Sequence, residues 1–166
     1  MTTLSFWGIP AVYFFIVIAI ILPRIPVVGK FFNIINTGLH ELGHALMALL
    51  MQGKVHKIEL LSDTSGTTVT QTPTNFGNIL VSLSGYIFAA AMGCFCCYLN
   101  HVGYQKGLII LLSVIFLFML ALWVRNVYGL IWIILFCGLN AWLLYDGKAL
   151  YVNMAALVYS VVLFCG

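Results

Sequence analysis

The sequence contains few charged residues and no polar stretch long enough to form a separate soluble domain. Asp, Glu, Lys and Arg make up 7% of the chain, whereas soluble domains carry about 25%. The seven basic residues are scattered singly between apolar runs, so no basic cluster predicts nucleic-acid binding. Internal repeats and low-complexity linkers are also missing. These absences exclude a soluble nucleic-acid-binding protein and predict one integral membrane domain, residues 1–166.

A disulfide framework is missing as well. The sequence has five cysteines, an odd number, and all of them fall in apolar runs. The C-x-C-C spacing at positions 94–97 is not a recognised metal or redox motif. We therefore expect the cysteines to act as small packing residues.

Long apolar runs are abundant. Hydrophobic residues make up 63% of the chain, a composition typical of membrane proteins. The breaks between the runs predict an all-α polytopic membrane protein with about six transmembrane helices, and we expect a multi-pass protein of the cell membrane. The last run stops without a polar tail, which predicts that the native chain continues beyond Gly166. The expected spans are 6–22, 27–52, 75–100, 107–124, 127–145 and 149–166.

The most polar segment, 53–74, separates the second span from the third. An imperfect alternation after Gly53, a turn cluster at 62–66 and a Thr-rich stretch predict a small β-hairpin at about 54–71. The edge of its second arm can pair with the main chain of an extended peptide. The candidate substrate-binding residues are Thr67, Thr68, Val69 and Thr70. An ordinary interfacial connector is the alternative interpretation.

The second span carries the H-E-x-x-H motif, formed by His40, Glu41 and His44. Histidines at i and i+4 project from one face of a helix, about 40° apart. Two imidazoles at this spacing can bind one Zn²⁺, and the glutamate beside them can take a proton from a water bound to the zinc. Ionisable residues are costly inside a membrane span, so this cluster predicts a functional metal site.

These residues predict hydrolysis with a zinc-activated water. Zn²⁺ bound by His40 and His44 would lower the pKa of its water towards about 7 and polarise a scissile carbonyl. Glu41 would be the general base and then the acid for the leaving amine. Two alternatives stay open: a zinc-binding membrane scaffold without catalysis, and a small transporter component that relays ions or protons.

Several segments resemble the site-2 protease family of intramembrane zinc metallopeptidases, in its compact branch without a peptide-binding domain. The resemblance implies cleavage of a transmembrane protein substrate within the lipid bilayer, with substrate choice left to the spans, the hairpin or an adaptor or regulatory membrane protein. It also implies a substrate-binding role for Asn140. The similar segments are 37–46, 53–55, 58–60, 65–70, 80–86, 125–129 and 140–147.

A catalytic zinc needs a third protein ligand. Asp146 is the candidate that the resemblance favours, because Asp146-Gly147 after an apolar run is similar to the family's Asp-Gly motif. Its place near the end of a span antiparallel to the histidine helix counts against it. A residue beyond Gly166 stays open, as do other candidates within the sequence: His56, Glu59, Asp63, His101 and the cysteines.

Overall fold

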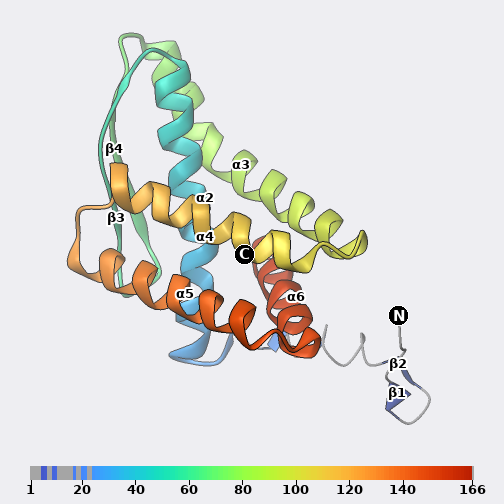
Figure 1. Cartoon of the computed structure of the whole chain (residues 1–166). Helices are drawn as coiled ribbons and strands as arrows, with labels where there is room; N and C mark the ends of the chain where they lie inside the picture. The colour runs from blue at the N-terminus through green and yellow to red at the C-terminus, as the bar shows by residue number, and fades with distance from the viewer. Residues whose placement is uncertain (1–4, 7–8, 11–16, 18–19, 22–23, 166) are drawn as a thin grey trace.

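The computed structural model describes residues 5–6, 9–10, 17, 20–21 and 24–165. Five helices and a two-stranded hairpin account for most of the described part, and Figure 1 shows the hairpin alongside the long helix α2. The elements are β1 (Ser5–Phe6), β2 (Ile9–Pro10), α2 (Val28–Leu50), β3 (Lys54–Leu60), β4 (Gly66–Gln71), α3 (Asn75–His101), α4 (Gln105–Leu122), α5 (Val127–Asp146) and α6 (Ala149–Cys165).

The helices agree with the expected spans from the second onward, since each boundary falls within two residues of its expected place. Within the described residues, three helices are long and apolar enough to cross a membrane: α3, α4 and α5. Helix α6 is apolar but shorter, and α2 carries Lys30 and the H-E-x-x-H motif. The count of six spans is not confirmed, and the first expected span, 6–22, lies mostly outside the described residues.

The predicted β-hairpin is confirmed. Strands β3 and β4 pair antiparallel from Lys54 opposite Gln71 to Leu60 opposite Gly66, with a register shift between Val55 and Lys57. Along β4, half-buried and exposed residues alternate. Such a period of two places one face of the strand against the body of the protein, and both strands contact α2.

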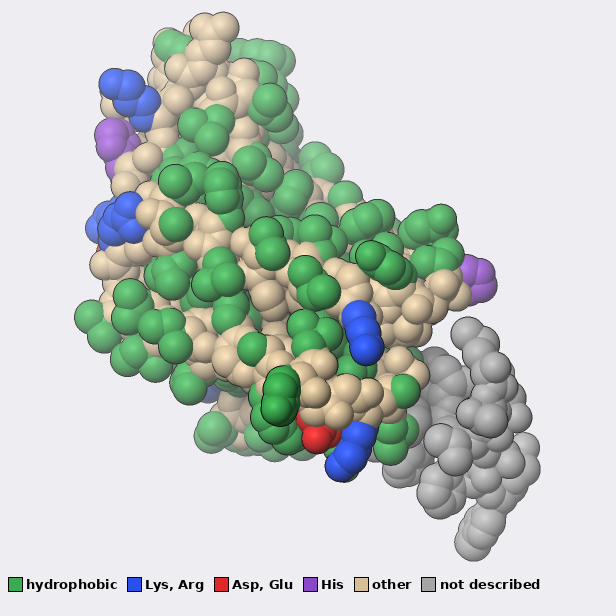
Figure 2. All heavy atoms as spheres, in the orientation of Figure 1, with side chains coloured by type: hydrophobic (Ala, Val, Ile, Leu, Met, Phe, Trp, Pro, Cys, Tyr) green, Lys and Arg blue, Asp and Glu red, His purple; other side chains and the backbone are tan. Residues whose placement is uncertain are grey.

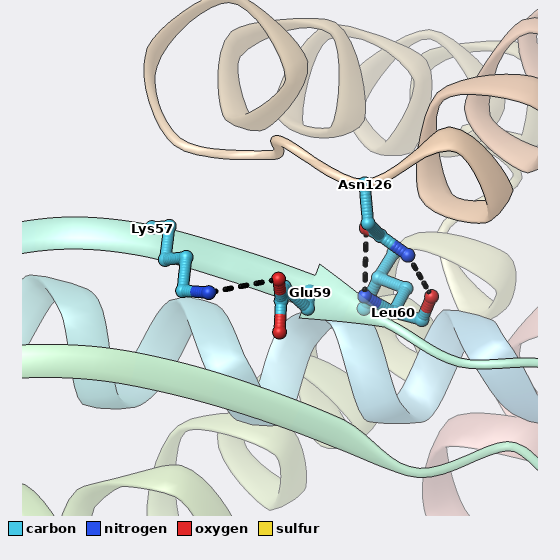
Figure 3. Close-up of polar contacts among 4 residues, drawn as sticks. All are labelled: Lys57, Glu59, Leu60 and Asn126. Carbon is cyan, nitrogen blue, oxygen red and sulfur yellow. Dashed lines mark hydrogen bonds and ion pairs between the residues drawn. The ribbon is translucent and has the colours of Figure 1, made fainter.

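The connection between α4 and α5 covers the outer edge of β3. The Ile58 N–H donates to the Trp123 carbonyl at 2.8 Å, and the Arg125 N–H donates to the Ile58 carbonyl at 3.3 Å. Figure 3 shows the Asn126 side chain bonded to both main-chain polar groups of Leu60, at 3.2 Å and 2.5 Å. These bonds satisfy an edge that would otherwise expose unpaired groups.

An aromatic cluster joins α4, α5 and α6. Trp132 stacks on Phe136 with ring centroids 5.0 Å apart, and Phe116 contacts both rings edge-on. Tyr159 of α6 lies 5.5 Å from Phe136. The Trp132 indole N–H donates to the Phe31 carbonyl at 3.0 Å and so ties this cluster to α2. Rigid packing of this kind fixes α2 within the bundle.

The surface is unusually apolar. Figure 2 shows hydrophobic side chains over most of the visible face, with few basic and acidic ones between them. On α4 the exposed hydrophobic residues recur with helical spacing, at Ile110, Val114, Leu117 and Phe118. A water-soluble helix would place polar residues on its outer face. The exposed apolar faces of α4 and α5 are those expected of helices in contact with lipid.

Candidate active site

The two histidines of the motif converge on one point. His40 and His44 lie on the same face of α2, and their Nε2 atoms are 2.9 Å apart. The Nδ1 atom of His44 lies 2.6 Å from the Val81 carbonyl oxygen of α3. A carbonyl only accepts, so Nδ1 of His44 carries the proton, and its unprotonated Nε2 accepts the hydrogen bond from His40 Nε2. Metal-binding histidines commonly have such a second partner.

Helix α3 forms the wall behind the two imidazoles. A Cβ at position 85 would lie 2.6 Å from His40 Cε1 and from His44 Nε2, distances too short for any side chain. Gly85 therefore allows the rings to pack directly on the α3 backbone. The neighbouring Ser84 hydroxyl donates to the Gly43 carbonyl at 3.1 Å, which ties the two helices together beside the histidines.

The glutamate of the motif contacts the hairpin instead of α3. Glu41 is buried, and its Oε2 accepts a hydrogen bond of 2.6 Å from the Thr68 hydroxyl of β4. Gly66 of the same strand packs on the other carboxylate oxygen, since a Cβ there would lie 2.7 Å from Oε1. One turn earlier, the Thr37 hydroxyl donates to the Thr64 carbonyl at 2.7 Å. The hairpin is thus held against α2 at the motif.

The turn between the strands has its own hydrogen bonds. Asp63 Oδ1 accepts from the Ser65 hydroxyl at 2.6 Å and from the Ser65 N–H at 3.0 Å. These bonds stabilise the charged carboxylate and hold the pKa of Asp63 below its ordinary value. Bonds from an aspartate to residues two positions on are typical of turns. Asp63 therefore acts in the turn and not at the histidines.

Of the four predicted substrate-binding residues on β4, Thr68 is the one whose side chain donates a hydrogen bond to the motif, to Glu41 at 2.6 Å. Thr67 and Val69 face outward and are exposed, while Thr68 and Thr70 lie on the half-buried face. Within the described residues, no backbone hydrogen bond outside the hairpin involves β4. The strand therefore has one edge paired with β3 and one edge without a main-chain partner in that part of the chain.

The predicted third ligand, Asp146, is not grouped with the histidines. It ends α5 ahead of Gly147, which has a left-handed backbone with φ of 67°, and its carboxylate lies 3.8 Å from the Lys148 ammonium. In the described part of the chain, no three His, Cys, Asp or Glu side chains come together closely enough to hold a metal. The structure brings His40 and His44 together but does not bring Asp146 to them.

The other candidate ligands are also apart from the motif. His56 lies exposed on β3, and His101 lies exposed at the end of α3. Glu59 pairs with Lys57 on the same strand at 3.0 Å (Figure 3), a partly exposed ion pair of the kind that contributes little to stability. His56 and His101 thus face solvent, and the half-buried Glu59 is already paired with Lys57.

Asn140 lies inside the bundle with both ends of its amide hydrogen-bonded. Its Oδ1 accepts from the Tyr159 hydroxyl at 2.6 Å, and its Nδ2 donates to the Ser113 hydroxyl at 2.9 Å. These bonds join α4, α5 and α6. In this arrangement the amide stabilises the helix packing. Its predicted role in binding substrate stays a prediction.

Zinc fits the two imidazoles with a small adjustment. Two Zn–N bonds of about 2.0–2.1 Å at a tetrahedral angle hold their nitrogens about 3.3 Å apart. The observed 2.9 Å between the Nε2 atoms would therefore open by about 0.4 Å. Two neutral imidazoles are borderline-soft nitrogen donors, which zinc prefers over magnesium or calcium. The fit covers two of the protein ligands that a catalytic zinc requires.

Sequence reasoning missed the α3 wall and the strand residues that contact the glutamate. Gly85 has no side chain that would mark it as part of a site, and a main-chain carbonyl such as that of Val81 has no sequence signature. Gly66 falls in the turn cluster at 62–66, a pattern that predicts a turn and gives no sign of a contact with Glu41. Tyr86, whose ring lies edge-on to His40 with centroids 4.5 Å apart, was also missed as a neighbour of the site. The only available signal was the pair Gly85-Tyr86 in a segment similar to the family.

One of the comparisons with known proteins finds a match. The family model of peptidase M50B-like proteins matches residues 13–166, which is most of the chain. No curated protein and no solved structure matches the chain. The match includes α2 with its motif, the hairpin, α3 and the three helices that follow. The chain belongs to the peptidase M50B-like family and, with it, to the site-2 proteases.

Proposed function

We propose that the protein is an intramembrane zinc metalloprotease that hydrolyses peptide bonds of transmembrane protein substrates. Membership of a peptidase family with apolar helices supports a membrane protease. The observation that carries the proposal is the convergence of the His40 and His44 Nε2 atoms, with the His44 ring held by the Val81 carbonyl. Two histidines one turn apart on α2, with their Nε2 atoms brought together and one ring held by a carbonyl, are the arrangement that two zinc ligands require.

Zinc, when bound, supplies a Lewis acid that polarises the scissile carbonyl and makes water more acidic. His40 and His44 would hold the metal through their Nε2 atoms, and the Val81 carbonyl keeps the proton of His44 on Nδ1. Glu41, next to one ligand in sequence, takes a proton from the attacking water and returns it to the leaving amine. Burial of Glu41 against the hairpin keeps competing solvent away from its carboxylate.

The edge of β4 that has no main-chain partner among the described residues is the proposed place for the substrate's main chain. An extended peptide that added to this edge would lie next to Glu41, because Thr68 of β4 contacts that residue. Main-chain pairing recruits a substrate without requiring a particular sequence. Thr67, Thr68, Val69 and Thr70 would then bind substrate, and a helical substrate would have to unwind locally to reach them.

The membrane setting follows the same proposal. The protein would be a multi-pass protein of the cell membrane, with the lipid-facing surfaces of α4 and α5 in the hydrocarbon. Water and a carbonyl must both reach the histidines, so the helices around α2 must leave a polar path to the motif. An adaptor or regulatory membrane protein would supply the selectivity that a separate peptide-binding domain supplies elsewhere.

The test compares wild-type protein with Glu41→Gln, each purified and reconstituted with a generic transmembrane substrate. Metal analysis should find zinc in both, because the substitution leaves the histidines intact. Only the wild type should cleave, since an amide cannot act as a base. A wild-type protein that binds zinc without cleaving would favour the non-catalytic scaffold. Equal turnover by Glu41→Gln would falsify the catalytic assignment of this residue.

A further inference from the structure

The carboxylate of Glu41 is seated on strand β4 by two neighbouring contacts. Its Oε2 accepts from the Thr68 hydroxyl at 2.6 Å, a distance typical of a strong bond to a charged acceptor. The same hydroxyl lies 3.2 Å from the Glu41 carbonyl oxygen. Thr68 therefore contacts the side chain and the main chain of one residue of α2. Glu41 is 6% exposed, so solvent does not compete for these positions.

The second contact is the close approach of Gly66. A Cβ at position 66 would lie 2.6 Å from Glu41 Cγ and 2.7 Å from Oε1. Gly66 and Thr68 are two residues apart on a strand, so they share the face that meets α2. Gly66 leaves room for the carboxylate, and Thr68 donates a hydrogen bond to it. The two together restrict how the carboxylate can rotate.

A carboxylate that acts as a base must be held in a defined orientation, because small displacements of catalytic groups are costly. The side chain of Glu41 has three rotatable bonds and no other hydrogen-bond partner within the described residues. Its orientation therefore depends on β4. The bond to Thr68 also leaves Oε1 as the oxygen that is free of a donor.

We propose that Thr68 is the positioning residue of Glu41 and that Gly66 leaves the space in which this positioning occurs. This inference rests on the proposed function, because it assigns the orientation of the proposed base. A peptide that pairs with the free edge of β4 would contact the same strand whose Thr68 positions Glu41. Substrate binding and the alignment of Glu41 are therefore coupled through β4.

The test uses Thr68→Val, which keeps the size, the β-branching and the main-chain N–H but removes the hydroxyl. We expect kcat to fall by about 10-fold to 100-fold, since a misplaced catalytic group can cost about that much. KM should change by less than about threefold, because the edge of β4 is retained. Thr68→Ser keeps the hydroxyl and should restore most of the lost kcat.

Thr72→Val is the matched control. Thr72 follows β4, and its hydroxyl lies 3.2 Å from the Thr74 carbonyl and 2.6 Å from Asn78 Oδ1, so it makes no bond to the motif. Its removal should leave kcat at the wild-type value. Gly66→Ala tests the space independently: the added methyl should displace the carboxylate and lower kcat while zinc content stays unchanged.

A second measurement does not depend on turnover. In a double-mutant cycle of thermal unfolding, Thr68→Val and Glu41→Ala should be non-additive because they remove two ends of one bond. Thr72→Val and Glu41→Ala should be additive. Additive effects of the first pair would overturn the inference, as would wild-type kcat in a folded Thr68→Val protein that cleaves substrate. Absence of cleavage by the wild type would overturn the proposed function as well.

Discussion

On one side of α2 the imidazoles of His40 and His44 meet a long apolar helix, and on the other side the Glu41 carboxylate meets a polar two-stranded hairpin. The histidine side packs on the backbone of α3 at Gly85, with the Val81 carbonyl bonded to His44. The glutamate side is held by a threonine hydroxyl of β4. Residues adjacent in sequence are therefore supported by elements of different kinds.

The histidine side of α2 would bind the metal, and the glutamate side would carry out the proton transfer. Helix α3 belongs to the apolar bundle, where tight packing keeps ligands in a fixed geometry. A two-stranded hairpin is only marginally stable by itself, and β3–β4 depends on the α4–α5 connection and on α2 for support. We therefore expect changes on the α3 side to alter zinc affinity and changes on the β4 side to alter turnover. Each prediction below tests this division.

The largest effect is expected at the ligands themselves. His40→Ala or His44→Ala should remove most of the zinc, since each takes away one of the two nitrogens that converge. Metal analysis of purified protein should find about one zinc per wild-type chain. His56→Ala and His101→Ala are matched controls, because both side chains are exposed away from the motif, and they should keep the metal. Wild-type protein that never takes up zinc on titration would end this interpretation.

The next effect is expected on the α3 wall. Gly85→Ala places a methyl group 2.6 Å from atoms of both imidazoles, so the rings must move apart from the position that suits one metal. Zinc affinity should fall by about 10-fold or more, a loss typical of disturbed support around metal ligands. Gly138→Ala is the control, because a Cβ there meets nothing within 4 Å. Unchanged affinity in a folded Gly85→Ala protein would remove α3 from the metal site.

Much of the fold could be predicted because apolar runs end where charged residues and glycine interrupt them. Arg125-Asn126 and Asp146-Gly147-Lys148 mark the two ends of α5. The H-E-x-x-H motif was also visible, because its spacing needs only one helix. The contact between Thr68 and Glu41 joins residues 27 positions apart and depends on the register and placement of the hairpin. No local pattern specifies that placement.

A smaller effect, on substrate binding and not on zinc content, is expected at the edge of β4 that has no main-chain partner among the described residues. Val69→Pro removes an N–H and disfavours strand pairing, so KM for a transmembrane substrate should rise several-fold. Zinc content should stay at the wild-type value, because β4 contributes no ligand. Val69→Ala separates the two causes: it keeps the N–H, and its effect should be smaller. A folded Val69→Pro protein that cleaves at the wild-type rate would leave the hairpin as a connector.

The smallest effect is expected at Asp146, on neither side of the motif. The carboxylate ends α5 and lies 3.8 Å from the Lys148 ammonium, and it forms no metal-binding group with other described residues. Zinc–oxygen bonds are near 2 Å, so a ligand must lie within the motif's immediate surroundings. Asp146→Ala should therefore change zinc affinity by less than about twofold, as should Lys148→Ala, its partner in the ion pair. Asp63→Ala, which disturbs only the hairpin turn, provides a second reference.

A 10-fold loss of affinity in Asp146→Ala alone would instead establish this carboxylate as the third ligand. The end of α5 would then have to move to the histidines when the metal binds. Zinc affinity would in that case depend on α5 as well as on α3.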